Sequence, residues 1–150
     1  MNSKETVLQA LETSLQSFFE GGAATNQIAS RKIKRWKRNM LTQPPSETPS
    51  ITIVDAWESI PEVSDASYVR YLLVVHLDML VKLDSKDDML EGLNNVIADV
   101  QKFCDTNQVG GDCIDVKLRS IESIQLYPDK NMADASAILH LRYLRTNGGV

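Results

Sequence analysis

Six basic residues stand within eight positions of this sequence, and no other segment carries so concentrated a chemical signal. This basic octet, Arg31–Arg38, consists of Arg31, Lys32, Ile33, Lys34, Arg35, Trp36, Lys37 and Arg38. Cations at this density pair with phosphates, and an indole among them can stack on a nucleic-acid base. The same segment could instead contact an acidic protein surface or form a solvated helix face. Because the chain carries −4 and the octet +6, the remainder carries −10, so a second copy of the protein is a suitable counterpart.

The other residues that could do chemistry lack the spacing that chemistry requires. His76 and His140 each stand in the middle of an expected strand, and no His-x-x-x-His, Cys-x-x-Cys or Glu-x-x-His pattern occurs. The aspartates near positions 84–88 and 105–115 are typical of a helix start and of solvated loops. The glycine pairs lack the residues of a phosphate loop, and no serine stands in a Gly-x-Ser-x-Gly turn. We therefore expect no enzymatic activity, no metal site and no cofactor.

Length and composition favour one domain over residues 1–150, with enough apolar content to form a core. The first residues do not resemble a signal peptide, and no run of about 18 apolar residues is present. We therefore expect a protein that is neither exported nor inserted in a membrane. Cys104 and Cys113 are the cysteines of the chain, and in a reducing cytosol we expect both to be free thiols.

The most regular pattern runs from Tyr68 to Cys104. In Tyr68–Leu83 every odd position is apolar while the even positions are mixed, which predicts a strand with one dry face. At about 3.3 Å per residue such a strand extends about 50 Å, so it is long enough to project past its own core. Apolar residues then recur at three- and four-residue steps, which predicts one amphipathic helix over Asp87–Phe103.

The remaining pattern gives further elements on either side. In chain order we predict a helix over Glu5–Phe19 that stops at Gly21-Gly22, a basic amphipathic helix or ordered loop over Gln27–Leu41, a proline-rich crossing segment over 42–49, a strand over Ser50–Glu58, a polar turn over Glu62–Ser67, a strand over Ile114–Tyr127, a strand over Ala133–Leu144 and a frayed end over 146–150. In the first strand we expect Trp57 to share a face with Ile51 and Ile53. The alternation slips near Ser120, which predicts a bulge or bend there.

Together these elements predict an α+β fold. Short turns between consecutive strands favour a mainly antiparallel four-stranded sheet with one long strand, and two amphipathic helices would pack on one face of it. The predicted architecture is a two-layer sandwich.

This order of elements resembles the tail terminator and tail-completion proteins of long-tailed bacteriophages. The resemblance is carried by the helix Glu5–Phe19, the variable crossing segment, the long strand Tyr68–Leu83, the helix Asp87–Phe103 and the closing strands that end at Arg145. It covers most of the chain and is one of architecture, because the family has no short diagnostic motif.

The resemblance implies a structural virion protein, made in the host cytoplasm and located where the tail meets the neck. Six copies would close a ring on the tail tube, end its polymerisation and join it to the head. The implied partners are the protein itself, the tail tube protein, the head-side neck or connector protein and, in a contractile tail, the sheath protein. DNA would pass through the lumen without specific binding. The basic octet departs from this pattern, and we expect it on a subunit or neck contact rather than in the lumen.

Two alternatives remain open from the sequence. A small nucleic-acid-binding protein would use the six cations of the basic octet on phosphates and Trp36 as a stacking platform. A head-side neck or stopper protein would have the same sequence features as a terminator.

Overall fold

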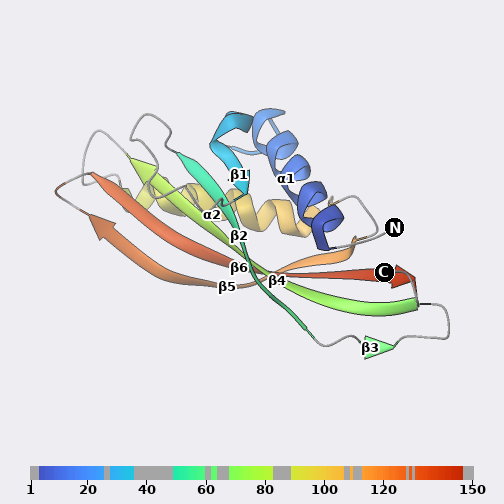
Figure 1. Cartoon of the computed structure of the whole chain (residues 1–150). Coiled ribbons are helices and arrows are strands. Elements are labelled where there is room, and N and C mark those ends of the chain that lie inside the picture. Colours follow the sequence, from blue (N-terminus) through green and yellow to red (C-terminus); the bar gives the residue numbers. More distant parts are fainter. Residues whose placement is uncertain are drawn as a thin grey trace.

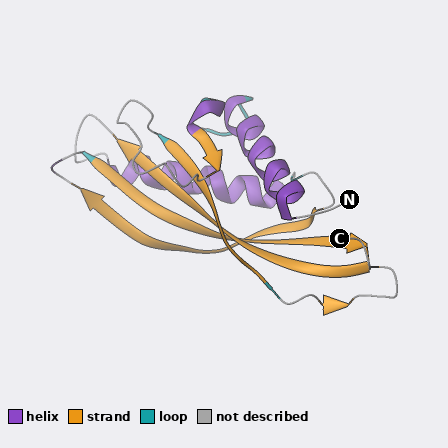
Figure 2. Ribbon diagram, viewed as in Figure 1, coloured by secondary structure: helices purple, strands orange, loops and turns teal. Residues whose placement is uncertain are grey.

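The fold is described by a computed structural model over residues 4–25, 28–35, 49–59, 62–63, 68–82, 89–106, 109, 113–127, 129 and 131–146. These residues form helices α1 (Lys4–Glu20) and α2 (Met89–Thr106), the 3₁₀ helix η1 (Ser30–Lys32) and strands β1 (Ile33–Arg35), β2 (Ser50–Glu58), β3 (Glu62–Val63), β4 (Tyr68–Lys82), β5 (Cys113–Tyr127) and β6 (Met132–Thr146). Figures 1 and 2 show one twisted sheet with α1 and α2 on the same side of it.

The sheet has the strand order β1-β2-β4-β6-β5, and β3 pairs with the first part of β4. All of these pairings are antiparallel except β1 with β2, which is parallel. The α+β class with helices on one face is confirmed, but the described chain has six strands rather than four. The prediction of one long strand is also wrong, because β4, β5 and β6 each contain 15 residues.

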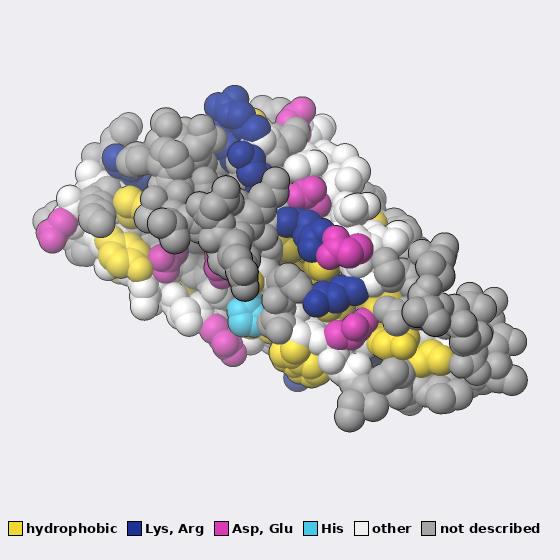
Figure 3. Space-filling view, in the orientation of Figure 1, with side chains coloured by type: hydrophobic (Ala, Val, Ile, Leu, Met, Phe, Trp, Pro, Cys, Tyr) yellow, Lys and Arg dark blue, Asp and Glu magenta, His cyan; other side chains and the backbone are white. Residues whose placement is uncertain are grey.

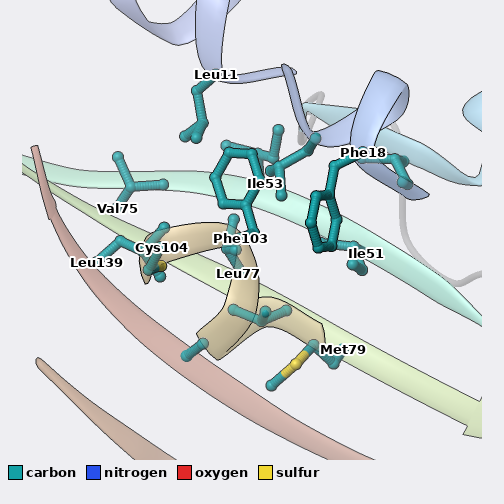
Figure 4. Packing of buried hydrophobic residues seen from close by; sticks show 14 of the residues in the cluster. Leu11, Phe18, Ile51, Ile53, Val75, Leu77, Met79, Phe103, Cys104 and Leu139 are labelled. Atoms are coloured by element: carbon teal, nitrogen blue, oxygen red, sulfur yellow. The ribbon is translucent and has the colours of Figure 1, made fainter. Parts of the chain in front are cut away.

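The core lies between the sheet and the two helices, and side chains from α1, α2, β2, β4 and β6 converge there in Figure 4. Leu73, Val75 and Leu77 of β4 are fully buried, which confirms the dry face predicted from the period of two. Phe18 of α1 and Phe103 of α2 meet edge to face with ring centroids 5.5 Å apart. Aromatic contacts of this kind add to the gain from apolar burial and hold the two helices together.

Polar contacts fix the end of α1 and the residues that follow it. The helix stops where the amide of Gly21 donates to the carbonyl of Ser17 at 2.9 Å, and Gly22 then takes a φ of 88° that favours glycine. Asp99 of α2 is only 2% exposed and accepts a hydrogen bond of 2.9 Å from the amide of Thr25. The buried carboxylate therefore ties the connection after α1 to α2.

Two irregularities in the strands change which side chains face the core. The register of β2 against β4 shifts between Asp55 and Trp57, so that Trp57 lies opposite Val74 on the other face and is 52% exposed. The prediction that Trp57 shares a face with the core residues of β2 is therefore wrong, because one extra residue reverses the alternation. In β5 the register shifts between Leu118 and Ser120, which confirms the predicted bulge.

Candidate assembly interface

The basic octet does not form a helix where the structure describes it. Arg31 and Lys32 belong to η1, and Lys34 and Arg35 to β1, which pairs with β2 in parallel. Of the two alternatives predicted over Gln27–Leu41, an amphipathic helix or an ordered loop, the helix is thus wrong for these positions. Ile33 is fully buried and anchors the short strand in the core, so its apolar side chain overrides the helical spacing of the charges.

Helix α1 covers the outer edge of β1 with two polar side chains. The side-chain amide of Gln16 donates to the carbonyl of Ile33 at 2.8 Å, and a carboxylate oxygen of Glu12 accepts from the amide of Arg35 at 2.9 Å. Residues two apart in a strand direct their backbone groups to the same side. The carbonyl of Ile33 and the amide of Arg35 therefore both lie on the edge of β1 that faces α1, away from β2. This edge of the sheet is therefore occupied within the chain and is protected from pairing with another strand.

The side chain of Arg35 is also held within the chain. Its guanidinium makes two hydrogen bonds to the carboxylate of Glu5, of 2.7 and 3.0 Å. Such a bidentate pair fixes the direction of the arginine. Arg35 is thereby directed toward α1 rather than toward a phosphate or a partner.

Among the other octet residues, Arg31 and Lys34 are exposed and Lys32 is half-buried. Basic side chains are visible along this part of the surface in Figure 3. Trp36, Lys37 and Arg38 lie outside the described residues. Within the described part, the structure brings Arg31, Lys32 and Lys34 to the surface but separates Arg35 from them by its contact with α1.

A second feature is a projection of the sheet, which we call the strand extension. It consists of β3, residues 68–70 of β4 and residues 144–146 of β6, and Figure 1 shows these strands continuing past the ends of α1 and α2. The predicted projection of the long strand past the core is therefore seen. The predicted polar turn over Glu62–Ser67 is corrected at its start, because Glu62 and Val63 form β3.

Aromatic packing supports the base of the strand extension. The rings of Tyr71 and Tyr143 stack with centroids 5.3 Å apart, and Tyr143 is fully buried. Its hydroxyl donates to the carboxylate of Glu58 at the end of β2. The amide of Ser59 then donates to the carbonyl of Leu72 at 2.8 Å, so β2 is fixed where the extension begins. These contacts make the projection a continuation of the packed sheet.

The long edge strand of the described sheet is β5, and its regularity is broken three times. Its register against β6 shifts between Cys113 and Asp115, between Leu118 and Ser120, and between Glu122 and Gln125, and Ser123 has a φ of 57°. Bulges of this kind blunt an edge against pairing with a foreign strand. The strand ends in exposed apolar side chains, Ile124, Leu126 and Tyr127. Hydrophobic surface is visible at that end of the sheet in Figure 3.

Both histidines lie on the sheet face opposite α1 and α2, where each is half-buried. Burial, together with the guanidinium groups of Arg119 and Arg142, lowers the pKa of His140, so its ring is neutral at pH 7. No group of three or more His, Cys, Asp or Glu suited to a metal ion occurs among the residues that the structure describes.

Cys104 is a free thiol buried near an open cleft between α2 and β5, as expected for that residue. Burial, with a smaller contribution from Asp105, raises its pKa to about 12. The side chain of Cys113 lies outside the described residues. At neutral pH the thiol of Cys104 is therefore protonated and a poor nucleophile. Neither described helix is long and apolar enough to cross a membrane.

Comparisons with known proteins add evidence about the fold. No family model and no curated protein matches the chain. One solved structure, which bears no functional name, is 16% identical with a TM-score of 0.53, and the match covers 97% of each chain. A chain from the virion of a native gene transfer agent particle is 11% identical with a TM-score of 0.47, over 93% of this chain and 92% of that one. The first likeness shows a shared fold, and the second is too weak to support an inference about this chain.

Proposed function

We propose that this protein is a structural component of a long-tailed phage virion. Six copies close into a ring on the last ring of the tail tube, end its growth and offer the opposite face to the neck. The protein has no catalytic role. Its partners are further copies of itself, the tail tube protein and a head-side neck protein, while DNA passes through the lumen without specific binding.

The strand extension carries this proposal, in a chain whose element order resembles that of the tail terminators. The described order is α1, β1, β2, β3, β4, α2, β5 and β6, with η1 before β1, so one helix precedes the long strand and one follows it. The sheet then reaches past its helical layer (Figure 1). A packed projection of this kind lets one subunit reach the next without changing its own core.

Ring closure needs one surface of a subunit to meet a different surface of the next subunit. The strand extension supplies one such surface. The exposed cations Arg31 and Lys34 supply a second, because the remainder of the chain is strongly acidic. Edge pairing through β1 is not available for this purpose, since Glu12 and Gln16 occupy its outer backbone groups.

Nucleic-acid binding through the same two cations, Arg31 and Lys34, is the alternative function, and one experiment separates it from the terminator role. In the variant R31Q/K34Q, the terminator role predicts weaker assembly and no change in oligonucleotide binding. The alternative predicts lost affinity for DNA and a shallower dependence of that affinity on salt. Fluorescence anisotropy with a labelled oligonucleotide separates the two, and K102Q, which removes an exposed cation on α2, is the control. The proposed function would be overturned if the wild type bound DNA tightly and R31Q/K34Q abolished that binding.

A further inference from the structure

The sheet face that points away from α1 and α2, which we call the outer face, has an ordered distribution of charge. Along β6, Asp134 and Arg142 stand four residues before and four residues after Ile138. All three lie on the outer face, because the residues between them, such as Leu139 and Leu141, are fully buried against the helices. Ile138 is thus the midpoint, along β6, between a negative and a positive side chain.

The neighbouring strand β5 repeats this arrangement. Lys117 pairs with His140, two residues after Ile138, and Glu122 pairs with Ser136, two residues before it. Lys117 and Glu122 are both exposed. The outer face therefore has an acidic half on one side of the Ile138 row and a basic half on the other. The acidic half holds Asp78, Glu122 and Asp134, with the exposed Lys82 at its far end, and the basic half holds Arg70, Lys117, Arg119 and Arg142, with Asp115 beside Arg142 at 3.9 Å.

Within one subunit, like charges are crowded together in each half. Burial and the nearby carboxylate of Asp78 raise the pKa of Asp134, although a hydrogen bond with Tyr127 acts in the opposite direction. In the basic half, Arg119 and Arg142 both act on His140. A partner that places a cation over Asp134 and an anion over Arg142 would add an attractive contact in each half.

The centre of the outer face is apolar. Val74 and Ile138 are 3% and 8% exposed, although they lie outside the cluster that packs against the helices. Leu72, Leu80 and His76 surround them and are half-buried. Because Val74 and Ile138 are already buried within the chain, the apolar surface that a partner could cover here comes from Leu72 and Leu80.

We propose that the outer face binds the outer face of a second copy of this chain. The two-fold axis would lie between the two sheets and run across the strands at the level of Ile138, so that β6 lies antiparallel over β6. Asp134 of each copy then lies over Arg142 of the other, and Glu122 over Lys117. This contact follows from the charge pattern and does not rest on the proposed function.

The size of the face fits such a pair. Thirteen residues of β4, from Arg70 to Lys82, span about 40 Å, and three strands are about 14 Å wide, which gives about 560 Å² per copy. The total of about 1,100 Å² is in the range of a specific but weak interface. Arg70 and Lys82 would approach each other at the corners, where the twist of packed sheets separates the two faces.

Charge reversal with mixing tests the pair. In R142E and in D134K the two copies present like charges to each other, and we expect self-association to weaken about tenfold in each variant. An equimolar mixture of R142E and D134K restores two attractive contacts, and so does the double variant R142E/D134K. The matched control is D105K, an acid-to-base reversal of an exposed residue on α2. Circular dichroism verifies that each variant is folded.

Sedimentation velocity over a range of concentrations gives the readout. Two copies of 16.8 kDa make 33.6 kDa. We expect this species in the wild type, the control, the mixture and the double variant. Its amount should be lower in R142E alone and in D134K alone. A wild type that stays at 16.8 kDa, reversals that associate as well as the wild type, or a mixture that fails to recover would each overturn the pair. A ring of six without any effect of these substitutions would support the proposed function and refute the outer-face contact.

Discussion

Removal of the side chains that cover β1 should destabilise the protein by an amount that can be estimated from two contacts. The carboxylate of Glu12 accepts from the amide of Arg35, and Gln16 donates to the carbonyl of Ile33. Both contacts are partly buried. A hydrogen bond to a charged group contributes about 1.5–3 kcal/mol and a neutral one about 0.5–1.5 kcal/mol. Alanine at the two helical positions returns less than about 0.5 kcal/mol through its higher helix propensity.

We therefore expect E12A/Q16A to lower the free energy of unfolding by about 2–4 kcal/mol, a large part of the stability of a small domain. Urea unfolding followed by circular dichroism measures this loss as a lower midpoint with an unchanged slope. E12Q keeps an oxygen acceptor for the amide of Arg35 and should lose less. Because the variant also uncovers an edge strand, light scattering should rise on warming.

The matched control for this prediction is Q9A/T13A, which changes two exposed positions on the same helix. Its stability should stay within about 0.5 kcal/mol of the wild type. If E12A/Q16A were as stable as Q9A/T13A, the covered edge would contribute nothing, and β1 would be held by its pairing with β2 instead.

Three further outcomes follow from the core and from the perturbed groups. In a C113S background, Cys104 should react slowly with Ellman's reagent at pH 8 and rapidly in urea, because burial raises its pKa to about 12; rapid labelling of the folded protein would contradict this. Replacement of the fully buried Phe103 by alanine should cost about 3–5 kcal/mol in urea unfolding, whereas L90A, at a side chain that is 48% exposed, should cost far less. Because burial raises the pKa of Asp134 in the folded state, folding binds a proton there, and wild-type stability should rise as the pH falls from neutral through that raised pKa. D134N should remove this gain in stability. If the free energy of unfolding depended on pH in the same way in D134N and in the wild type, this prediction would be refuted.

Long elements were predictable from the sequence because each repeats one pattern many times. The period of two over Tyr68–Leu83 matches β4, and the helical spacing over Glu5–Phe19 matches α1 within one residue at each end. The slip near Ser120 also marked a real bulge, because an extra residue in a strand shifts every later side chain to the other face.

Short strands and distant contacts were not predictable in this way. β1 has three residues, too few to show a period, and its edge is satisfied by α1 side chains 17 and 23 positions away. Arg31 and Lys34 of the basic octet are exposed, which fits each of the alternatives left open for this segment, but the pairing of Arg35 with Glu5 depends on how the chain folds back on itself. The two charged halves of the outer face likewise depend on the register of β5 against β6, which three irregularities determine.

The mass of the purified protein in solution tests the proposed ring most directly. Light scattering behind a sizing column, over a range of concentrations and with or without a DNA oligonucleotide, measures it. Six copies of 16.8 kDa make 100.8 kDa, and we expect a species of this mass that DNA does not change. A protein that stays at 16.8 kDa and increases in mass only when DNA is added would contradict the ring and make the basic octet a nucleic-acid site.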